Sequence, residues 1–136
     1  MTGQNLKIGG GGFHHIALKA ANFEKSVKFY TEGLGFLISM SWGEGNGRAV
    51  MLDTGDGNFL ELFAGGTPGE KPEGSLLHMA FRTDNCDMAL NQAIAAGAVV
   101  TKEPFDVDIK SDPVTPVRIA FCKGFDGEVI EFFQYR

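Results

Sequence analysis

The chain has 136 residues, of which 43% are hydrophobic and 21% are charged, a balance typical of one globular domain. Its formal net charge is −5 and no cluster of Lys and Arg stands out, which argues against binding to nucleic acid or to an anionic membrane surface. No apolar run approaches the roughly 20 residues of a membrane span. The two cysteines show no metal or redox spacing, so we expect free thiols in a reducing cytoplasm.

The first part of the chain predicts an arm followed by a strand, a helix and three more strands. Residues 1–12 contain four consecutive glycines and no apolar signal-peptide region, so we expect a flexible N-terminal arm. Phe13–Ala20 alternates between apolar and polar residues, which predicts a strand. Asn22 is a suitable helix N-cap, and apolar residues follow at helical spacing until Gly33 and Gly35. The further strands are predicted at about Phe36–Trp42, Arg48–Asp53 and Asn58–Phe63.

The second half of the chain shows the same order of elements. They are a strand at Leu76–Thr83, a helix at Cys86–Ala96, and strands at Val99–Glu103, Val114–Phe121 and Glu128–Tyr135. The proline-bearing stretch from Glu103 to Pro116 is predicted to be a longer loop. The sequence therefore predicts an α+β fold in which a single domain, residues 13–136, consists of two βαβββ modules at 13–66 and 75–136.

The two modules also repeat individual residues, which is the strongest sign of an internal duplication. His15–Lys19 (His-Ile-Ala-Leu-Lys) matches His78–Arg82 (His-Met-Ala-Phe-Arg) 63 positions later. Asp56–Phe63 matches Asp126–Phe133 70 positions later. The duplication therefore aligns one histidine and one glutamate of each module with their counterparts in the other.

Those residues, His15, Glu61, His78 and Glu131, are predicted to hold one divalent metal ion. Each glutamate lies between apolar neighbours in a strand, where an unpaired carboxylate costs several kcal/mol, so it should have a cation partner. Alternate side chains of a strand share a face, which places each histidine and glutamate opposite the residues that pack in the core. Two imidazoles and two carboxylates suit Zn²⁺, Ni²⁺, Co²⁺, Mn²⁺ or Fe²⁺.

Several neighbouring side chains leave alternatives open. His14 is a competing ligand, although by parity it faces the helix and it has no histidine counterpart in the second module. Lys19 and Arg82 share the predicted ligand faces, and they either anchor an anionic substrate or reach solvent from the strand ends. Two further basic residues and the single tryptophan could also line the site, in directions that the pattern does not fix: Arg48, Arg118 and Trp42.

These motifs resemble the vicinal oxygen chelate superfamily, which includes glyoxalase I, methylmalonyl-CoA epimerase, fosfomycin-resistance and bleomycin-resistance proteins, and extradiol dioxygenases. The resemblance rests on His15-Ile16-Ala17-Leu18, on Ser26–Tyr30 with Leu34–Phe36, and on the closing run Asp126–Glu131. It implies two modules forming a curved mixed sheet around a cleft that holds the metal. It also implies a homodimer acting on a small molecule, with the modules pairing either within one chain or between two chains.

The four predicted ligands match the ligand positions of glyoxalase I. This resemblance implies a metal-dependent lyase or isomerase that removes a proton next to a carbonyl and stabilises the resulting enediolate. Glu131 is then the first candidate for the base and Glu61 the second. Glutathione or another thiol is an implied cofactor, but its binding pattern matches poorly, because Gly65, Gly74 and Leu77 stand where the family has Asn, Arg and a small residue.

Two other functions remain open at this stage. Dioxygenases and fosfomycin-resistance thiol transferases of the superfamily use two histidines and one glutamate, which here would be His15, His78 and Glu131. The presence of Glu61 favours glyoxalase-like chemistry over both. A metal-free small-molecule-binding protein of the bleomycin-resistance type lacks this ligand set altogether.

Overall fold

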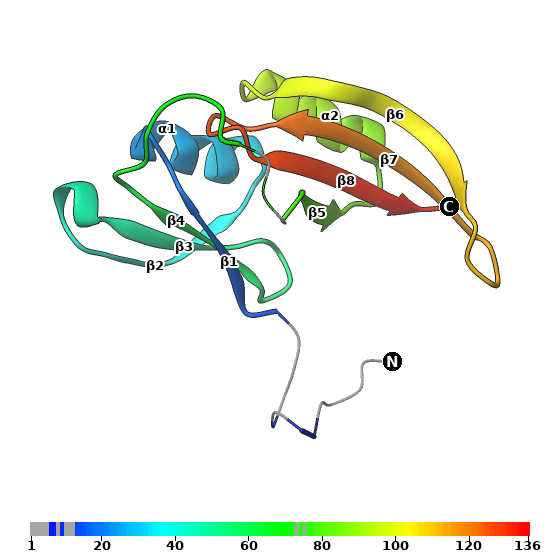
Figure 1. Cartoon of the computed structure of the whole chain (residues 1–136), viewed down its shortest axis with the longest axis horizontal. Helices are drawn as coiled ribbons and strands as arrows, with labels where there is room; N and C mark the ends of the chain where they lie inside the picture. The colour runs from blue at the N-terminus through cyan, green and yellow to red at the C-terminus, as the bar shows by residue number, and fades with distance from the viewer. Residues whose placement is uncertain (1–5, 8, 10–12, 73, 75) are drawn as a thin grey trace.

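The first module forms one four-stranded sheet with a helix on one of its faces (Figure 1). The computed structural model describes residues 6, 7, 9, 13–72, 74 and 76–136, so most of the predicted arm at 1–12 lies outside the described residues. The elements are β1 (His15–Lys19), α1 (Phe23–Lys28), the π-helical turn η1 (Phe29–Gly33), β2 (Leu37–Trp42), the 3₁₀ turn η2 (Gly45–Gly47), β3 (Ala49–Asp53) and β4 (Phe59–Phe63). The sheet order is β1-β4-β3-β2, with β1 and β4 parallel. The side chain of Asn22 accepts the N–H of Lys25 at 3.1 Å, so the predicted helix cap is confirmed.

The second module repeats this arrangement. Its elements are β5 (Met79–Arg82), α2 (Cys86–Ala95), β6 (Val99–Ile109), β7 (Thr115–Lys123) and β8 (Val129–Tyr135). The sheet order is β5-β8-β7-β6, again with the first and last strands of the module parallel. The predicted α+β fold with two βαβββ modules is therefore confirmed. No helix in the described part of the chain is both long and apolar enough to cross a membrane.

The largest difference from the predicted element boundaries lies between the second and third strands of the second module. The stretch from Glu103 to Pro116 was expected to be a loop, but β6 continues to Ile109 and β7 begins at Thr115, so the two strands form a long hairpin. Pro104 is tolerated because β6 is an edge strand of its sheet, and because the proline lies within a register shift between Lys102 and Phe105. Strand order is a tertiary property, and a proline by itself does not reveal it.

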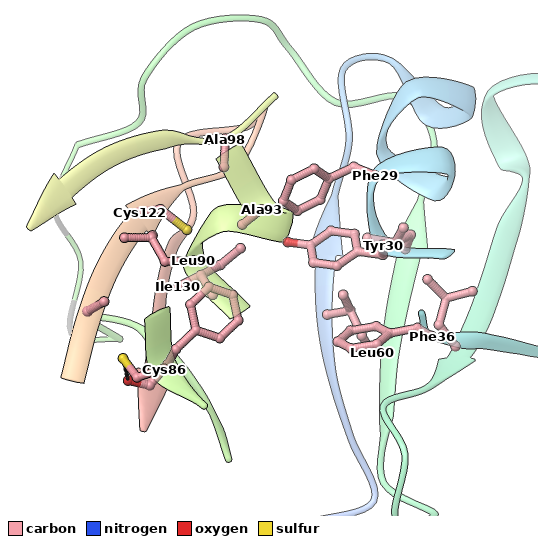
Figure 2. Packing of buried hydrophobic residues seen from close by; sticks show 14 of the residues in the cluster. Phe29, Tyr30, Phe36, Leu60, Cys86, Leu90, Ala93, Ala98, Cys122 and Ile130 are labelled. Atoms are coloured by element: carbon pink, nitrogen blue, oxygen red, sulfur yellow. Dashed lines mark hydrogen bonds between the residues drawn. The ribbon is translucent and has the colours of Figure 1, made fainter. Parts of the chain in front are cut away.

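The hydrophobic core lies between the two modules, where the helices pack (Figure 2). Phe29 and Tyr30 of the first module meet Leu90 and Ala93 of α2 in one buried cluster. Each fully buried side chain of this size contributes roughly 1.5–3 kcal/mol to folding. Because both sheets turn one face to this shared core, the other face of each sheet points away from it. We call that second face the open face.

Hydrogen bonds fasten the modules at one end of the core. Asp126, in the turn before β8, accepts the backbone N–H of Ala21 at 2.8 Å and the hydroxyl of Ser26 at 3.2 Å. The hydroxyl of Tyr30 donates to Glu128 at 2.7 Å. Asp126 and Tyr30 are both buried. These contacts fix the turn of the second module against α1 and η1 of the first.

Candidate metal centre

Strand register places both predicted glutamates on the open faces. On β4, Leu60 and Leu62 belong to the core cluster, so Glu61 between them points the other way. On β8, Ile130 and Phe132 belong to the core in the same manner, so Glu131 also lies on an open face. Both glutamates therefore lie on the face opposite the core, as the alternation along each strand predicts.

The first half-site consists of His15 and Glu61. The Nε2 atom of His15 lies 3.7 Å from an oxygen of Glu61, whose side chain is largely buried while the imidazole is exposed. The Nδ1 atom of His15 lies 3.0 Å from Nδ1 of His14, and the His14 ring packs against Phe59 with a centroid separation of 5.1 Å. His15, not His14, thus turns a nitrogen towards the glutamate, while His14 holds the opposite side of its ring.

The second half-site consists of His78 and Glu131. His78 lies just before β5, and its Nε2 atom is 3.0 Å from an oxygen of Glu131. The Glu131 side chain is largely buried, and this burial raises the pKa of its carboxyl, while the charge of His78 acts in the opposite direction. The His78 ring meets Phe121 edge to face at 5.8 Å. A largely buried carboxylate beside an imidazole is the kind of group that takes up and releases protons in general acid–base catalysis.

Each half-site has a geometry that suits a shared metal ion. Two donor atoms that each lie about 2.0–2.2 Å from one ion are roughly 2.8–3.6 Å apart. The observed separations of 3.0 Å and 3.7 Å lie within and just beyond that interval. Imidazole nitrogens with carboxylate oxygens, and no thiolate, fit Zn²⁺, Ni²⁺, Co²⁺, Mn²⁺ or Fe²⁺.

One chain brings together two pairs of the predicted ligands, not all four. Within residues 6, 7, 9, 13–72, 74 and 76–136, no three His, Cys, Asp or Glu side chains lie close enough to hold a metal ion. The reason is the packing of the modules, because the shared core lies between the two sheets and the open faces point away from it. The site with four ligands therefore remains a prediction. It requires an arrangement of modules that brings the two histidine–glutamate pairs together.

The remaining predicted side chains divide between the open faces and the helix side. Lys19 pairs in register with Phe63 and Arg82 with Phe133, which places both cations on open faces. Trp42 contacts Phe63 with ring centroids 6.5 Å apart, so it too lies on an open face. The two arginines whose direction was open are engaged elsewhere: Arg48 with Glu24, and Arg118 with Asp87 and Asp106.

A cleft of about 730 Å³ runs along the edges of the two sheets. Residues of both modules line it, among them His15 of β1, Arg82 of β5 and Tyr135 of β8, and His15 is the one predicted ligand in its walls. Sequence reasoning missed two features of this region. The contact of His14 with His15 has no sequence signal beyond adjacency, and the Phe63–Trp42 pair could have been found only from strand register.

Comparison with known proteins places the chain among relatives of similar length. The profile of the Glyoxalase/Bleomycin resistance protein/Dioxygenase superfamily matches residues 12–132. The uncharacterized protein YwkD of Bacillus subtilis (strain 168) is 32% identical over 127 residues, which cover 89% of this chain and 94% of that protein. A Vibrio cholerae protein (serotype O1, strain ATCC 39315 / El Tor Inaba N16961) named "Probable lactoylglutathione lyase" is 29% identical, with 88% of each chain covered. The glyoxalase family protein from Enterococcus faecalis has a similar structure, with a TM-score of 0.71 and 22% identity over 90% of this chain and 97% of that chain.

Proposed function

The chain belongs to the Glyoxalase/Bleomycin resistance protein/Dioxygenase superfamily, and on that basis we propose that it is a divalent-metal-dependent lyase or isomerase of the glyoxalase I type. The observation that carries the proposal is the pair of equivalent half-sites, His15 with Glu61 and His78 with Glu131, on the open faces of the two modules. A fourth ligand at Glu61 separates this set from the three-ligand relatives. The similarity to a protein named as a lactoylglutathione lyase supports the same class of chemistry.

The proposal includes a second copy of the chain. The open faces point away from the core, so a two-fold symmetric dimer can bring His15 and Glu61 of one chain beside the partner's His78 and the partner's Glu131. A two-fold axis then creates two identical sites, each with two ligands from each chain. Each module has its first strand at one edge of its sheet, β1 in the first and β5 in the second, and the half-sites lie beside these edges, so we propose that the partner meets the sheets there.

Glu131 is the proposed base. A metal held by the four ligands would supply the positive charge that stabilises negative charge developing on adjacent substrate oxygens. The Glu131 carboxylate would take the proton from the carbon next to the carbonyl and return it to the neighbouring carbon. Burial raises the pKa of the Glu131 carboxyl, which favours proton uptake when the carboxylate is not bound to a metal ion. Glu61 is the second candidate for this role.

Cations on the open faces are proposed to anchor an anionic part of the substrate. Lys19 lies two residues from Ala17, the cross-strand neighbour of Glu61, and Arg82 lies two residues from Ala80, the neighbour of Glu131. A thiol cofactor is less well supported. Gly65 has φ +80° and a Cβ added there would lie 3.1 Å from the Asn46 carbonyl oxygen, so an asparagine at this position would be strained.

The test is metal binding followed by turnover. Chelator-treated protein should gain melting temperature on addition of Ni²⁺ or Zn²⁺, because the ion binds the folded state only. The metal-loaded protein should then catalyse exchange of a substrate proton next to a carbonyl for deuterium. NMR in D₂O measures this exchange over a panel of two compound types, 2-oxo acids and the thiol adducts of 2-oxoaldehydes. If none of Zn²⁺, Ni²⁺, Co²⁺, Mn²⁺ and Fe²⁺ raised the melting temperature, the proposal would be contradicted. Bound Fe²⁺ with O₂ uptake would instead identify a dioxygenase.

A further inference from the structure

A row of side chains crosses the open face of the first sheet beside its half-site. Strand register places Lys19 next to Phe63, Phe63 next to Ala49, and Ala49 next to Trp42. Phe63 lies two residues after Glu61 on β4, so the row shares the face of the half-site and is its neighbour along the strands. A substrate held at the half-site would therefore extend over this row.

Two aromatic rings meet above the small residue in the middle of the row. The rings of Phe63 and Trp42 have centroids 6.5 Å apart and stand at 87°, an edge-to-face arrangement. Ala49 beneath them is 1% exposed, whereas Trp42 remains 42% exposed. The alanine thus lets side chains from two non-adjacent strands touch. The result is a continuous aromatic surface with a buried floor and an open upper side.

A single cation stands at the other end of the row. Neighbouring strands are about 4.8 Å apart, so the backbone of Lys19 lies one strand spacing from that of Phe63, and both side chains share one face. Among the described residues, the Lys19 ammonium forms neither an ion pair nor a side-chain hydrogen bond. Arg48, the other cation near Trp42 in sequence, pairs with Glu24 instead. The single positive charge of this ammonium can balance the charge of one monoanionic group of a ligand.

The second module does not repeat this surface. Its equivalent row contains Phe133, Ile119 and Phe105, so a branched side chain replaces the alanine in the middle. The ring of Phe133 packs instead on Tyr135 of the same strand, with centroids 5.2 Å apart, and Lys102 covers Phe105 at 4.4 Å. The aromatic surface is therefore a property of the first module and not a general consequence of the duplication.

From these contacts we infer that the row binds an aryl carboxylate, with the flat ring on Trp42 and Phe63 and the carboxylate on Lys19. The inference rests on the proposed function, because this group would be the part of the substrate remote from the carbon that loses its proton. A ring is favoured over an alkyl chain because it can contact the edge of one aromatic side chain and the face of the other. A carboxylate is favoured over a phosphate dianion because one ammonium is available.

Trp42 is the only tryptophan of the chain, so its fluorescence reports on this surface alone. The probe is 3-phenylpropanoate, with 3-phenylpropanol lacking the charge and butanoate lacking the ring. We expect a saturable change in emission with the first compound and at least about tenfold weaker binding of the other two, equivalent to about 1.4 kcal/mol. Equal affinities for the three compounds, or no saturable change, would overturn the inference.

Matched lysine variants test the contact at the charged end. Lys19→Met should weaken binding of 3-phenylpropanoate about tenfold. Lys28→Met, on the exposed side of α1 where the lysine pairs with Glu32, should bind like the wild type. Unchanged binding in Lys19→Met, or an equal loss in Lys28→Met, would contradict the assigned position of the carboxylate.

A metal titration separates this inference from the proposed function. Trp42→Leu should lose binding of 3-phenylpropanoate in calorimetry and keep the rise in melting temperature with Ni²⁺, because Trp42 is not a proposed ligand. If the probe binds the wild type and no metal does, the proposed function fails and the aryl site stands. If metal binds and the probe does not, the aryl site fails and the proposed function stands.

Discussion

The Asp-Gly turns before the last strand of each module occupy equivalent positions but hold different parts of the molecule. In the first module, Asp56 accepts the backbone N–H of Asn58 at 3.0 Å and the hydroxyl of Thr54 at 3.2 Å, both within its own turn. In the second, Asp126 accepts the N–H of Ala21 and the hydroxyl of Ser26, both in the other module. The two Asp-Gly turns therefore differ in role, because Asp56 stabilises its own turn and Asp126 links the two modules.

The half-sites show the opposite behaviour. A histidine and a glutamate remain paired in both modules, at 3.7 Å and 3.0 Å, although the surrounding residues have diverged. A metal site shared by two modules requires the same histidine–glutamate pair in each module. It does not require the contacts that hold the modules together to be alike. The following experiments use one module as the control for the other.

The largest expected effect separates the two glutamates. Glu131→Gln should lower the rate of deuterium exchange at least about a hundredfold, because an amide cannot accept the proton. Glu61→Gln should have a smaller effect on this rate if the residue acts only as a ligand. Both variants should keep the wild-type circular dichroism spectrum. Full activity in Glu131→Gln would refute its role as the base, and loss of activity in Glu61→Gln alone would transfer that role to Glu61.

A smaller effect distinguishes the two Asp-Gly turns. Asp126→Ala leaves the buried hydroxyl of Ser26 and the backbone N–H of Ala21 without their acceptor, which should lower the free energy of unfolding by about 2 kcal/mol. Asp56→Ala removes an exposed local contact and should cost about 0.5 kcal/mol or less. Urea denaturation of both variants measures the difference. Equal losses would show that Asp126 does not fasten the modules.

Of the two residues that precede the proposed ligand histidines, His14 should affect the metal affinity and Leu77 should not. His14→Ala removes the ring nitrogen beside His15 Nδ1 and should weaken metal binding about tenfold, because partners of a ligand imidazole fix its orientation. Leu77→Ala, at the equivalent position before His78, should leave the affinity unchanged. Competition with a chromophoric chelator measures both. Identical affinities in the two variants would remove His14 from the site.

The smallest expected effect concerns pH. Burial raises the pKa of Glu128 above the usual value of 4.5, against the opposing hydrogen bond from Tyr30. Folding therefore favours the protonated form, so the stability linked to Glu128 is fully present below pH 4.5 and is lost as the pH rises through the raised pKa. Glu128→Gln, which stays neutral, should flatten that part of the stability profile. The free energy of unfolding should be measured against pH for the wild type and for Glu128→Gln. The same slope in both proteins would contradict this role of Glu128.

The sequence was sufficient for the features that repeat locally. Alternation around Glu61 and Glu131, together with the recurrence of each histidine, predicts which strand face carries each half-site, and the structure has both pairs. The length of β6 was missed because Pro104 is acceptable only on an edge strand, and strand order is not a local property. The role of Asp126 was missed for the same reason, since its partners lie about a hundred residues away in the other module. Periodicity assigns a side chain to a face but does not determine how two modules pack.

The central claim is that each metal site takes two ligands from each of two chains, and complementation tests it most directly. One variant carries His15→Ala with Glu61→Ala, and the other carries His78→Ala with Glu131→Ala. Each alone should fail to bind the metal. When the two variants are refolded together in equal amounts, half of the dimers should contain one chain of each. Each mixed dimer should have one intact site of its two, so the mixture should bind about a quarter of the wild-type amount of metal per chain. No recovery of bound metal in the mixture, with both variants folded and dimeric, would contradict the account.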